Sequence, residues 1–527
     1  MEDECSSEDS PPTLSRKQNP SRILFASCNS QNLTQPLWPV MASRHPAALV
    51  WVGDAIYADA FAGFDFWKLL PKHNAATPTQ LRQYYQEQSL HPGYAAFLKG
   101  NRTTVFGAID DHDYGMNNGD RTYKYKRESA MAYMDFIGEP SDSLMRRRSE
   151  QGKGIYGVKL FDFARESGRQ LISEKEAGID PDVTLEIAPN YSNHSVAVFI
   201  LDVRSNRSPW PKGLAAWRQS DEGEMLGEEQ WSWLERALKN SKATVNVIVS
   251  GLQVHPHHYP NANMAEEWYK YPRERQRLYE LLLQEGLNSP IIISGDVHMA
   301  QLMRKDCFRR DDPSEARSLV EFTTSGLTHS WGTIFASSEH IHKSWYAWYV
   351  SFFGKTFMGF LHLDGICPWT ELIEAKGNCN NSNLHENGGA ERSKSGKQYS
   401  LELNFGELDF DWEKRVVQAR AFGMRGTDRP LLSASWSFDQ LSGQEDMPRG
   451  GVTMDHILNA SPQITDKWVC INHNGPTNSA HYTLILFLSS ILLIFLVLLP
   501  YLLIGCGTIF AARIFGTPKK KNARVTQ

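Results

Sequence analysis

The sequence predicts an α/β fold in which helices cover the faces of a β-sheet. Two observations support this: short apolar runs typical of buried strands, and amphipathic stretches typical of helices that alternate with them along the chain. The strand candidates are Ile23–Ala26, Ala48–Val52, Thr104–Ile109, Ser195–Leu201, Thr244–Val249 and Pro290–Ile293. The helix candidates include Pro78–Leu90, Glu128–Phe136, Gly227–Asn240 and Pro272–Glu285.

The length and composition fit a protein with a sizeable core. The chain has 527 residues, of which 41% are hydrophobic and 22% charged, enough for one large domain or two to three average ones. With a net charge of -5 and a pI near 6.4, no nucleic-acid-binding surface is indicated.

The predicted globular domain covers residues 21–441. Residues 1–20 are polar and acidic and predict a disordered leader, and residues 377–396 predict a flexible insertion. After the insertion come four candidate antiparallel strands: Tyr399–Leu403, Glu407–Trp412, Arg415–Phe422 and Leu431–Phe438. Residues 442–481 are expected to form a stalk.

An uncharged apolar segment, residues 482–512, predicts one transmembrane helix with a kink at Pro500. The alternative is a fully buried helix of a soluble domain. The tail, residues 513–527, contains four Lys or Arg within Lys519–Arg524, and Val469–His481 before the span contains none. The positive-inside rule therefore predicts a cytosolic C-terminus and a catalytic domain that is extracellular or lumenal.

Two further features bear on the side of the membrane. Seven Asn-x-Ser/Thr sequons favour a lumenal glycoprotein, whereas residues 1–20 contain no apolar signal region. Either the domain is cytosolic and tail-anchored, or the given N-terminus is incomplete. Four cysteines (Cys307, Cys367, Cys379 and Cys470) could form two disulfides in an oxidising compartment, or could be unpaired buried thiols.

Polar side chains follow four of the predicted strands. They occur as Ser27-Cys28-Asn29, Gly53-Asp54, Asp110–Gly115 and Gly295-Asp296-Val297-His298. In an open α/β sheet the carboxyl ends of the strands share one edge, where ligands bind, so these groups are expected to converge. Carboxylates suit Ca²⁺, Mg²⁺ or Mn²⁺, and thiolate with phenolate suits iron, so a cluster of two or more metal ions is expected.

The motifs FASCN, WVGDAIYAD, IDDHDYGMNNGD, FILDVRSNR, ISGDVHMAQL and EFTTSGLTHSW resemble those of the PhoD-like branch of the calcineurin-like metallophosphoesterases. The resemblance covers roughly residues 21–440. It implies a four-layer α/β/β/α sandwich and hydrolysis of phosphate esters by a metal-activated water, with iron and calcium or another divalent ion as cofactors.

The resemblance also implies roles for individual residues. Asp54 would bridge two metals, Tyr57 and Cys28 would bind iron, and Asp111, Asp296 and His298 would be further ligands. His112 would donate a proton to the leaving group or steady the phosphate. Arg204, in the LDVR segment, is a candidate for bidentate phosphate recognition.

Some positions depart from the family pattern or stay open. The aromatic residue expected after Arg204 is Ser205, and the isolated histidine of the superfamily falls near Gln253–His255. His255, His257 and His258 are ligand candidates, with a solvated His-rich loop as the alternative. His329 is equally compatible with a site role and a structural role.

Two other functions remain in view. The aromatic segment Trp345–Phe360 would suit a phospholipid-directed phosphodiesterase at the bilayer, or plain core packing. A catalytically silent membrane receptor is the second alternative. Against the receptor, every aligned site position holds a competent ligand type.

Overall fold

The computed structural model describes residues 21–65, 70–100, 103–165, 171–183, 189–209, 219–256, 266–333, 399–445 and 466–471, with Phe487 and Ile491. Within these ranges the strands are β1 (Arg22–Ala26), β2 (Ala48–Val52), β3 (Ala60–Asp65), β4 (Leu70–Asn74), β5 (Thr104–Ala108), β6 (Gly157–Asp162), β7 (Leu171–Ile172), β8 (Ser195–Ile200), β9 (Val245–Ser250), β10 (Pro290–Ser294), β11 (Ala300–Arg309), β12 (Ala316–Thr324), β13 (Tyr399–Ser400), β14 (Phe405–Asp411), β15 (Val416–Phe422), β16 (Leu432–Ser437) and β17 (Trp468–Ile471). The helices are α1 (Trp38–Ala42), α2 (Pro78–Leu90), α3 (Pro92–Gly100), α4 (Asp111–Tyr114), α5 (Lys126–Phe136), α6 (Leu144–Glu150), α7 (Glu174–Ala177), α8 (Glu228–Asn240), the 3-10 helix η2 (Trp268–Lys270), α9 (Pro272–Leu282) and α11 (Phe438–Leu441).

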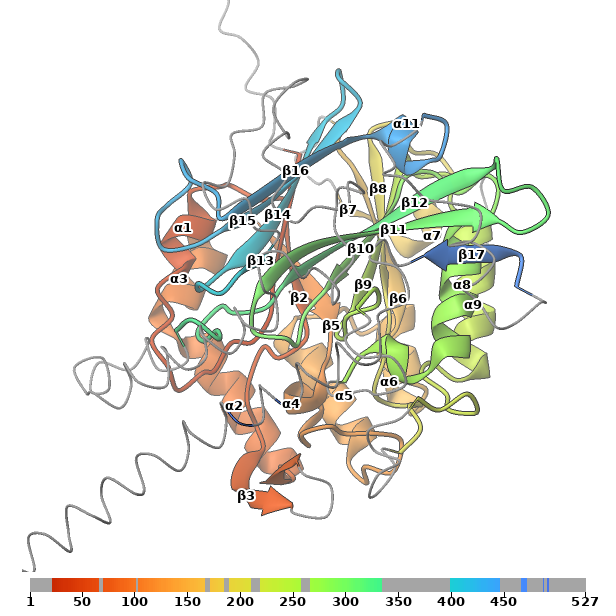
Figure 1. Cartoon of the computed structure of the whole chain (residues 1–527). Coiled ribbons are helices and arrows are strands. Elements are labelled where there is room, and N and C mark those ends of the chain that lie inside the picture. The colour runs from red at the N-terminus through yellow and green to blue at the C-terminus, as the bar shows by residue number, and fades with distance from the viewer. Residues whose placement is uncertain are drawn as a thin grey trace, which may run out of the picture.

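Two sheets form the centre of the molecule (Figure 1). The first has the strand order β16-β15-β14-β1-β2-β5, in which β1, β2 and β5 run parallel. The second has the order β13-β11-β12-β10-β9-β8-β6-β7, with β8, β9, β10 and β12 parallel. The mixed α/β fold expected from the sequence is therefore confirmed.

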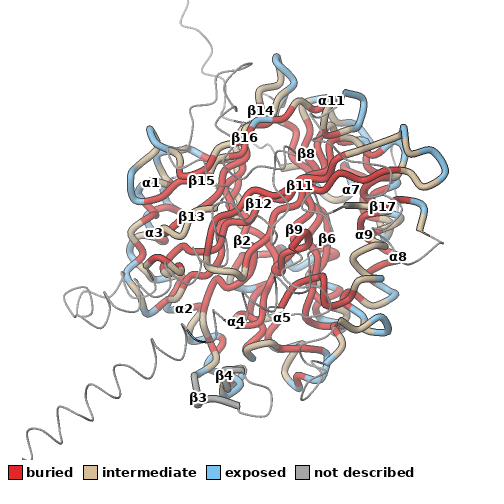
Figure 2. The backbone as a smooth tube through the Cα atoms, in the orientation of Figure 1, coloured by how far each residue is buried: buried red, intermediate tan, exposed pale blue. Residues whose placement is uncertain are grey.

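The two sheets pack face to face. Phe25 on β1 meets Phe322 on β12 edge to face, with ring centroids 5.1 Å apart. The cluster around them combines apolar side chains from both sheets, such as Val50 and Val247, and all are buried. Figure 2 shows this buried interior running through the central strands, with exposed residues confined to the peripheral loops and helix surfaces.

Helices cover the outer faces of both sheets. On the first sheet, Trp51 of β2 packs against Trp38 of α1 and Phe136 of α5, with centroids 5.9 and 6.3 Å apart. On the second sheet, a separate apolar cluster joins Phe199 of β8 to Trp231 of α8. This layering leaves the strand ends as the place where polar loops from both sheets can meet.

Strand β17 corrects the predicted stalk. Trp468–Ile471, within the predicted interval 442–481, pair antiparallel with Asp306–Arg309 of β11. Cys470 forms a disulfide with Cys307, and Trp468 is buried. These four residues complete the second sheet, so the folded domain extends beyond residue 441.

Several predictions fall outside the described residues. They are the leader 1–20, the aromatic segment Trp345–Phe360, the insertion 377–396 and nearly all of the apolar segment 482–512. Among the residues that the structure describes, none of the helices combines the length and apolarity needed to cross a bilayer.

Candidate metal centre

The carboxyl ends of the parallel strands of both sheets meet at one place. The amide of Gly295, after β10, donates to the carbonyl of Gly251, after β9, at 3.1 Å. Across the sheets, Leu327 N donates to Ser27 O at 3.1 Å, and the Ser27 hydroxyl donates to Thr324 O at 3.1 Å. The loops that carry the predicted site residues are thereby fixed to one another.

Four of the predicted site residues adopt left-handed backbone conformations. The φ angles are +56° for Cys28, +50° for Asp54, +72° for Asp296 and +53° for His298. Such angles are uncommon for residues with a Cβ and carry a strain of about 1–3 kcal/mol each, so they persist where surrounding structure enforces them. Each lies just after a strand, and the sharp turn of the chain directs its side chain into the site.

Glycine is required beside two of these residues. A Cβ on Gly53, whose φ is +84°, would lie 2.4 Å from Cβ of Asp110, and a Cβ on Gly295 would lie 2.3 Å from the Val52 carbonyl oxygen. The Gly-Asp pairs therefore reflect close packing between neighbouring strand ends as well as turn geometry.

One half of the site consists of a thiol, a phenol and an imidazole. Cys28 Sγ lies 3.5 Å from Asp54 Oδ2, and Tyr57 Oη donates to the same oxygen at 3.3 Å. His298 Nε2 lies 3.1 Å from Tyr57 Oη. Burial raises the pKa of the Cys28 thiol. Burial, followed by repulsion from Cys28 and Asp54, also raises the pKa of the Tyr57 phenol. Burial lowers the pKa of His298 to about 4.

Carboxylates form the other half. Asp54, Asp110, Asp111 and Asp296 each place one oxygen so that all four lie within 4.8 Å of one another, and a second such group combines Asp54, Asp111 and His112. Burial, reinforced by the neighbouring carboxylates Asp110 and Asp111, raises the pKa of Asp296 well above its usual range. Asp54 Oδ1 and Asp110 Oδ2 are buried without a hydrogen-bond donor. Cations would satisfy these oxygens and offset the repulsion, so the donor set fits metal ions.

His112 is held at the side of this cluster by Asp59. Its Nδ1 lies 2.5 Å from Asp59 Oδ1, and its ring stacks on Tyr57 with centroids 4.0 Å apart. Burial disfavours the charged ring, but the carboxylates of Asp111, Asp54 and Asp59 outweigh this and raise the pKa of His112. The contact with Asp59 thus fixes the orientation of the His112 ring beside the carboxylate cluster.

Arg204 lies beside the carboxylate cluster, with Nη2 2.5 Å from Asp110 Oδ1 and 3.8 Å from Asp111 Oδ1. Its side chain is fully buried, with Nε donating to Asp110 Oδ1 at 2.5 Å and Nη1 to Glu266 Oε2 at 2.5 Å. The guanidinium is therefore engaged by protein carboxylates. This geometry lets Arg204 support the acidic loop, and its contact with a phosphate stays a prediction.

The structure also adds residues that the sequence reasoning missed. They are Asp59, which binds His112; Ser325, whose Oγ lies 2.9 Å from Cys28 Sγ; and Glu266, which joins Arg204 to Arg207. Asp59 and Ser325 lie inside the recognised motifs WVGDAIYAD and EFTTSGLTHSW. Asp59 lies two residues after Tyr57, and Ser325 lies four residues before His329. This closeness to candidate site residues was the signal that could have identified them.

The remaining histidine candidates separate clearly. His329 lies in the site, with Nε2 3.0 Å from Tyr57 Oη. His255 is buried away from it, with Nδ1 3.1 Å from the Tyr279 hydroxyl and Nε2 3.1 Å from Leu319 O. It is a hydrogen-bonded core residue. His257 and His258 lie outside the described residues.

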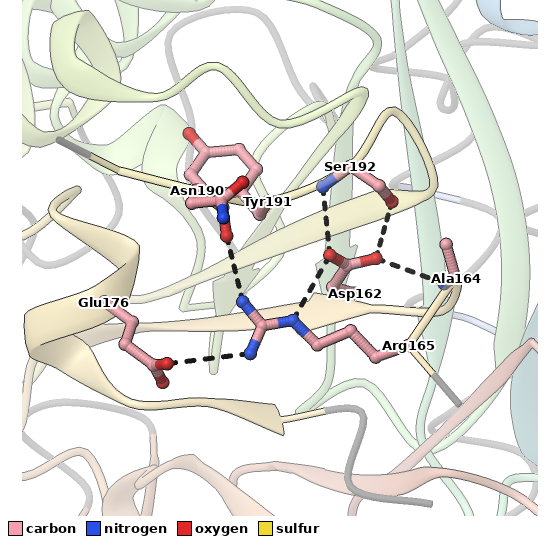
Figure 3. A pocket seen from close by; sticks show the side chains of 7 residues that line it. All are labelled: Asp162, Ala164, Arg165, Glu176, Asn190, Tyr191 and Ser192. Atoms are coloured by element: carbon pink, nitrogen blue, oxygen red, sulfur yellow. Dashed lines mark hydrogen bonds and ion pairs between the residues drawn. The ribbon is translucent and has the colours of Figure 1, made fainter. Parts of the chain in front are cut away.

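A separate pocket of about 550 Å³ lies beside β6 and the loop before β8 (Figure 3). Arg165 occupies it, 3.6 Å from Asp162, 3.7 Å from Glu176 and donating to Asn190 O at 2.9 Å. One arginine thus faces two carboxylates, and none of the predicted site residues lines this pocket. The strand-end cluster is therefore the stronger candidate for chemistry.

The fold and this cluster define a mixed α/β protein with an acidic, metal-compatible centre at its strand ends. Residues 192–348 match the family model for PhoD-like phosphatase, which confirms the resemblance inferred from the motifs. Among solved structures, one titled "Structure of PhoD" aligns with 16% sequence identity and a TM-score of 0.46, covering 79% of this chain and 68% of that chain. No curated protein matches the chain. The family match supports a phosphatase of the PhoD-like kind.

Proposed function

We propose that this protein is a metal-dependent phosphoric ester hydrolase. The observation that carries the proposal is the convergence of Asp54, Asp110, Asp111 and Asp296 within 4.8 Å, beside Cys28 and Tyr57. Four carboxylates in one buried place are costly unless cations bind them. The PhoD-like phosphatase match over residues 192–348 gives the reaction class.

The two halves of the site suit different metals. Cys28 and Tyr57 offer the ligands that iron prefers, and the carboxylates suit calcium or another hard divalent ion. Asp54 would bridge the halves, since its Oδ2 contacts Cys28 and Tyr57 and it belongs to both carboxylate groups that could hold a metal. Metal ions bound here would supply an activated water and neutralise charge developing on a phosphoryl group.

The chain's own residues would orient and protonate the substrate. His112, held by Asp59, is placed to give its proton to the leaving oxygen of the ester. Arg204 holds Asp110, and Asn118 N donates to Asp111 Oδ2 at 2.7 Å, so both carboxylates keep a fixed orientation. Substrate selectivity between monoesters, soluble diesters and phospholipids is a matter for direct assay.

We also propose that the domain acts on the extracellular or lumenal side of a membrane, held there by residues 482–512. The disulfide between Cys307 and Cys470 supports an oxidising compartment. Asn32, Asn190 and Asn193 head sequons and are exposed, as glycan acceptors must be. Protease protection of the domain in sealed membrane vesicles, together with a glycosidase-sensitive mass, would test this placement.

The decisive experiment is hydrolysis of phosphate monoesters, soluble diesters and phospholipids by the purified full chain. Ending the protein at residue 441 would remove β17 and the disulfide, so the full chain is required. Metal content is measured in parallel for the wild type, Asp54→Asn and the control Asp135→Asn, an exposed ion-paired carboxylate.

We expect chelator-sensitive activity, lost with the bound metal in Asp54→Asn and retained in Asp135→Asn. The loss should exceed the roughly 10–100-fold typical of removing an outer-shell partner of a metal ligand. A folded wild type that binds no metal and cleaves none of the esters would refute the proposal and favour the receptor alternative.

A further inference from the structure

Three polar atoms surround the hydroxyl of Tyr57. Asp54 Oδ2 lies 3.3 Å from it, His329 Nε2 lies 3.0 Å from it, and His298 Nε2 lies 3.1 Å from it. A phenol has one proton to donate. Which of the three atoms accepts this proton depends on which ring nitrogens of the two histidines carry hydrogen.

The tautomer of His329 follows from its other hydrogen bond. Its Nδ1 lies 3.0 Å from Thr328 Oγ1. That hydroxyl gives its single proton to the Cys28 carbonyl at 3.2 Å and accepts from Ser30 N at 2.9 Å. With the Thr328 proton on the Cys28 carbonyl, Nδ1 of His329 is assigned as the donor in this contact.

With the hydrogen on Nδ1, Nε2 of the neutral His329 ring presents a lone pair to Tyr57 Oη. The phenol proton can satisfy either this nitrogen or Asp54 Oδ2, and the other keeps an unmatched lone pair. A metal-binding histidine characteristically donates its second ring nitrogen to an oxygen acceptor, which fixes the ring and its tautomer. Thr328 supplies that acceptor here.

We propose that His329 is a further metal ligand, which binds through Nε2 the same ion as Cys28 and Tyr57. The inference rests on the metal centre proposed above and specifies it. One ion would then be held by a thiolate, a phenolate and the two imidazoles of His298 and His329, with Asp54 as the bridge to the carboxylate half.

This assignment gives the centre a defined asymmetry. Nitrogen and sulfur donors select borderline metals such as iron or zinc, whereas oxygen donors select calcium or magnesium. His329 contacts Tyr57, and its ring lies 4.5 Å from that of His298. Its removal should therefore weaken the borderline-metal position and leave the calcium position unchanged.

The test is the number of imidazoles around a bound zinc ion, measured by X-ray absorption on the full chain. The protein is stripped with chelator and reloaded with one equivalent of Zn²⁺ and excess Ca²⁺. The variants are His329→Ala and the control His45→Asn, which removes an exposed imidazole from the loop before β2. Zinc affinity is measured separately by competition with a chromophoric chelator.

We expect two imidazoles in the wild type and in His45→Asn, and one in His329→Ala, with zinc affinity reduced at least tenfold and calcium content unchanged. One imidazole in the wild type, or two in the variant, would overturn the assignment and leave His329 as a hydrogen-bond partner of Tyr57. If His329→Ala does not fold, the more conservative His329→Asn takes its place, with the same expected loss of one imidazole. Absence of ester hydrolysis in the wild type would refute the proposed function but not this count.

Discussion

Asp59 is expected to act on the reaction through His112, and replacing it tests the proton-donor role. Its carboxylate is 1% exposed, and Oδ1 lies 2.5 Å from His112 Nδ1. The substitution Asp59→Asn keeps the size and one acceptor oxygen but removes the charge. The other oxygen, which accepts from Asn117 N at 3.2 Å, becomes an amide nitrogen facing a donor.

The size of the effect follows from this contact. A hydrogen bond to a charged group contributes about 1.5–3 kcal/mol, against about 0.5–1.5 kcal/mol for a neutral pair. The loss of about 1–1.5 kcal/mol corresponds to a rate reduction of roughly five- to tenfold where protonation of the leaving group limits the reaction. The variant should still bind its metals, because Asp59 is outside both carboxylate groups that could hold them.

The assay compares two phosphate monoesters. An alkyl ester has a poor leaving group that needs a proton, whereas a nitrophenyl ester leaves without one. Asp59→Asn should therefore reduce kcat for the alkyl ester by roughly five- to tenfold and that for the nitrophenyl ester much less. Equal reductions for both esters at full metal content would refute the reasoning, as would no reduction for either; Asp135→Asn is the control.

Three further outcomes are expected. Gly53→Ala should abolish metal binding and lower the melting temperature, because a Cβ there would lie 2.4 Å from Asp110 Cβ; normal metal content would contradict this. Cys470→Ser opens a disulfide that spans 163 residues and should reduce the free energy of unfolding by about 2–5 kcal/mol, measured by denaturant unfolding without reductant. Burial raises the pKa of Glu321 to about 7, so its stabilising contribution is present below its ordinary pKa and is lost as pH rises through 7. Glu321→Gln should flatten the pH dependence of unfolding between about pH 4.5 and 7 by up to about 3 kcal/mol, and an unchanged slope would exclude Glu321 as its source.

The sequence predicted the strands that are buried on both faces. Ala48–Val52 was predicted with the bounds of β2, and Pro290–Ile293 falls one residue short of β10. Such strands are continuous apolar runs bounded by Gly and polar residues. The site followed from them, because the carboxyl ends of parallel strands share one edge. That principle predicted that Cys28, Asp54 and Asp296 lie close together before any of their contacts was known.

Other elements were missed because their sequences lack a local signal. Strand β11, Ala300–Arg309, contains Arg304, Lys305 and Asp306 and shows no apolar alternation, although its side chains are largely buried. Strand β17 is four residues long and pairs with a partner more than 150 positions away in the chain. Tertiary context decides both, and local propensity cannot report it.

The ion pairs of Arg204 were missed for a related reason. Arginine in a motif of a phosphate-processing family suggests phosphate recognition, and the sequence contains no sign that Asp110 and Glu266 would engage its guanidinium. These partners are 94 and 62 residues distant and lie on different loops. The charge of a side chain can be predicted from sequence, but its availability depends on partners that only the fold supplies.

The backbone of the site links its chemistry to its stability. Asn, Asp and His are the residues with a Cβ that best tolerate left-handed angles, so Asp54, Asp296 and His298 combine ligand chemistry with the conformation their turns require. Cys28 shares the conformation without that tolerance. A serine would match its size and could accept the same neighbouring hydrogen bonds, so fold stability alone does not explain a cysteine at this strained position. A thiolate ligand, as proposed above, would explain it, and the proposal requires that Cys28→Ser keeps the fold but loses binding of a borderline metal.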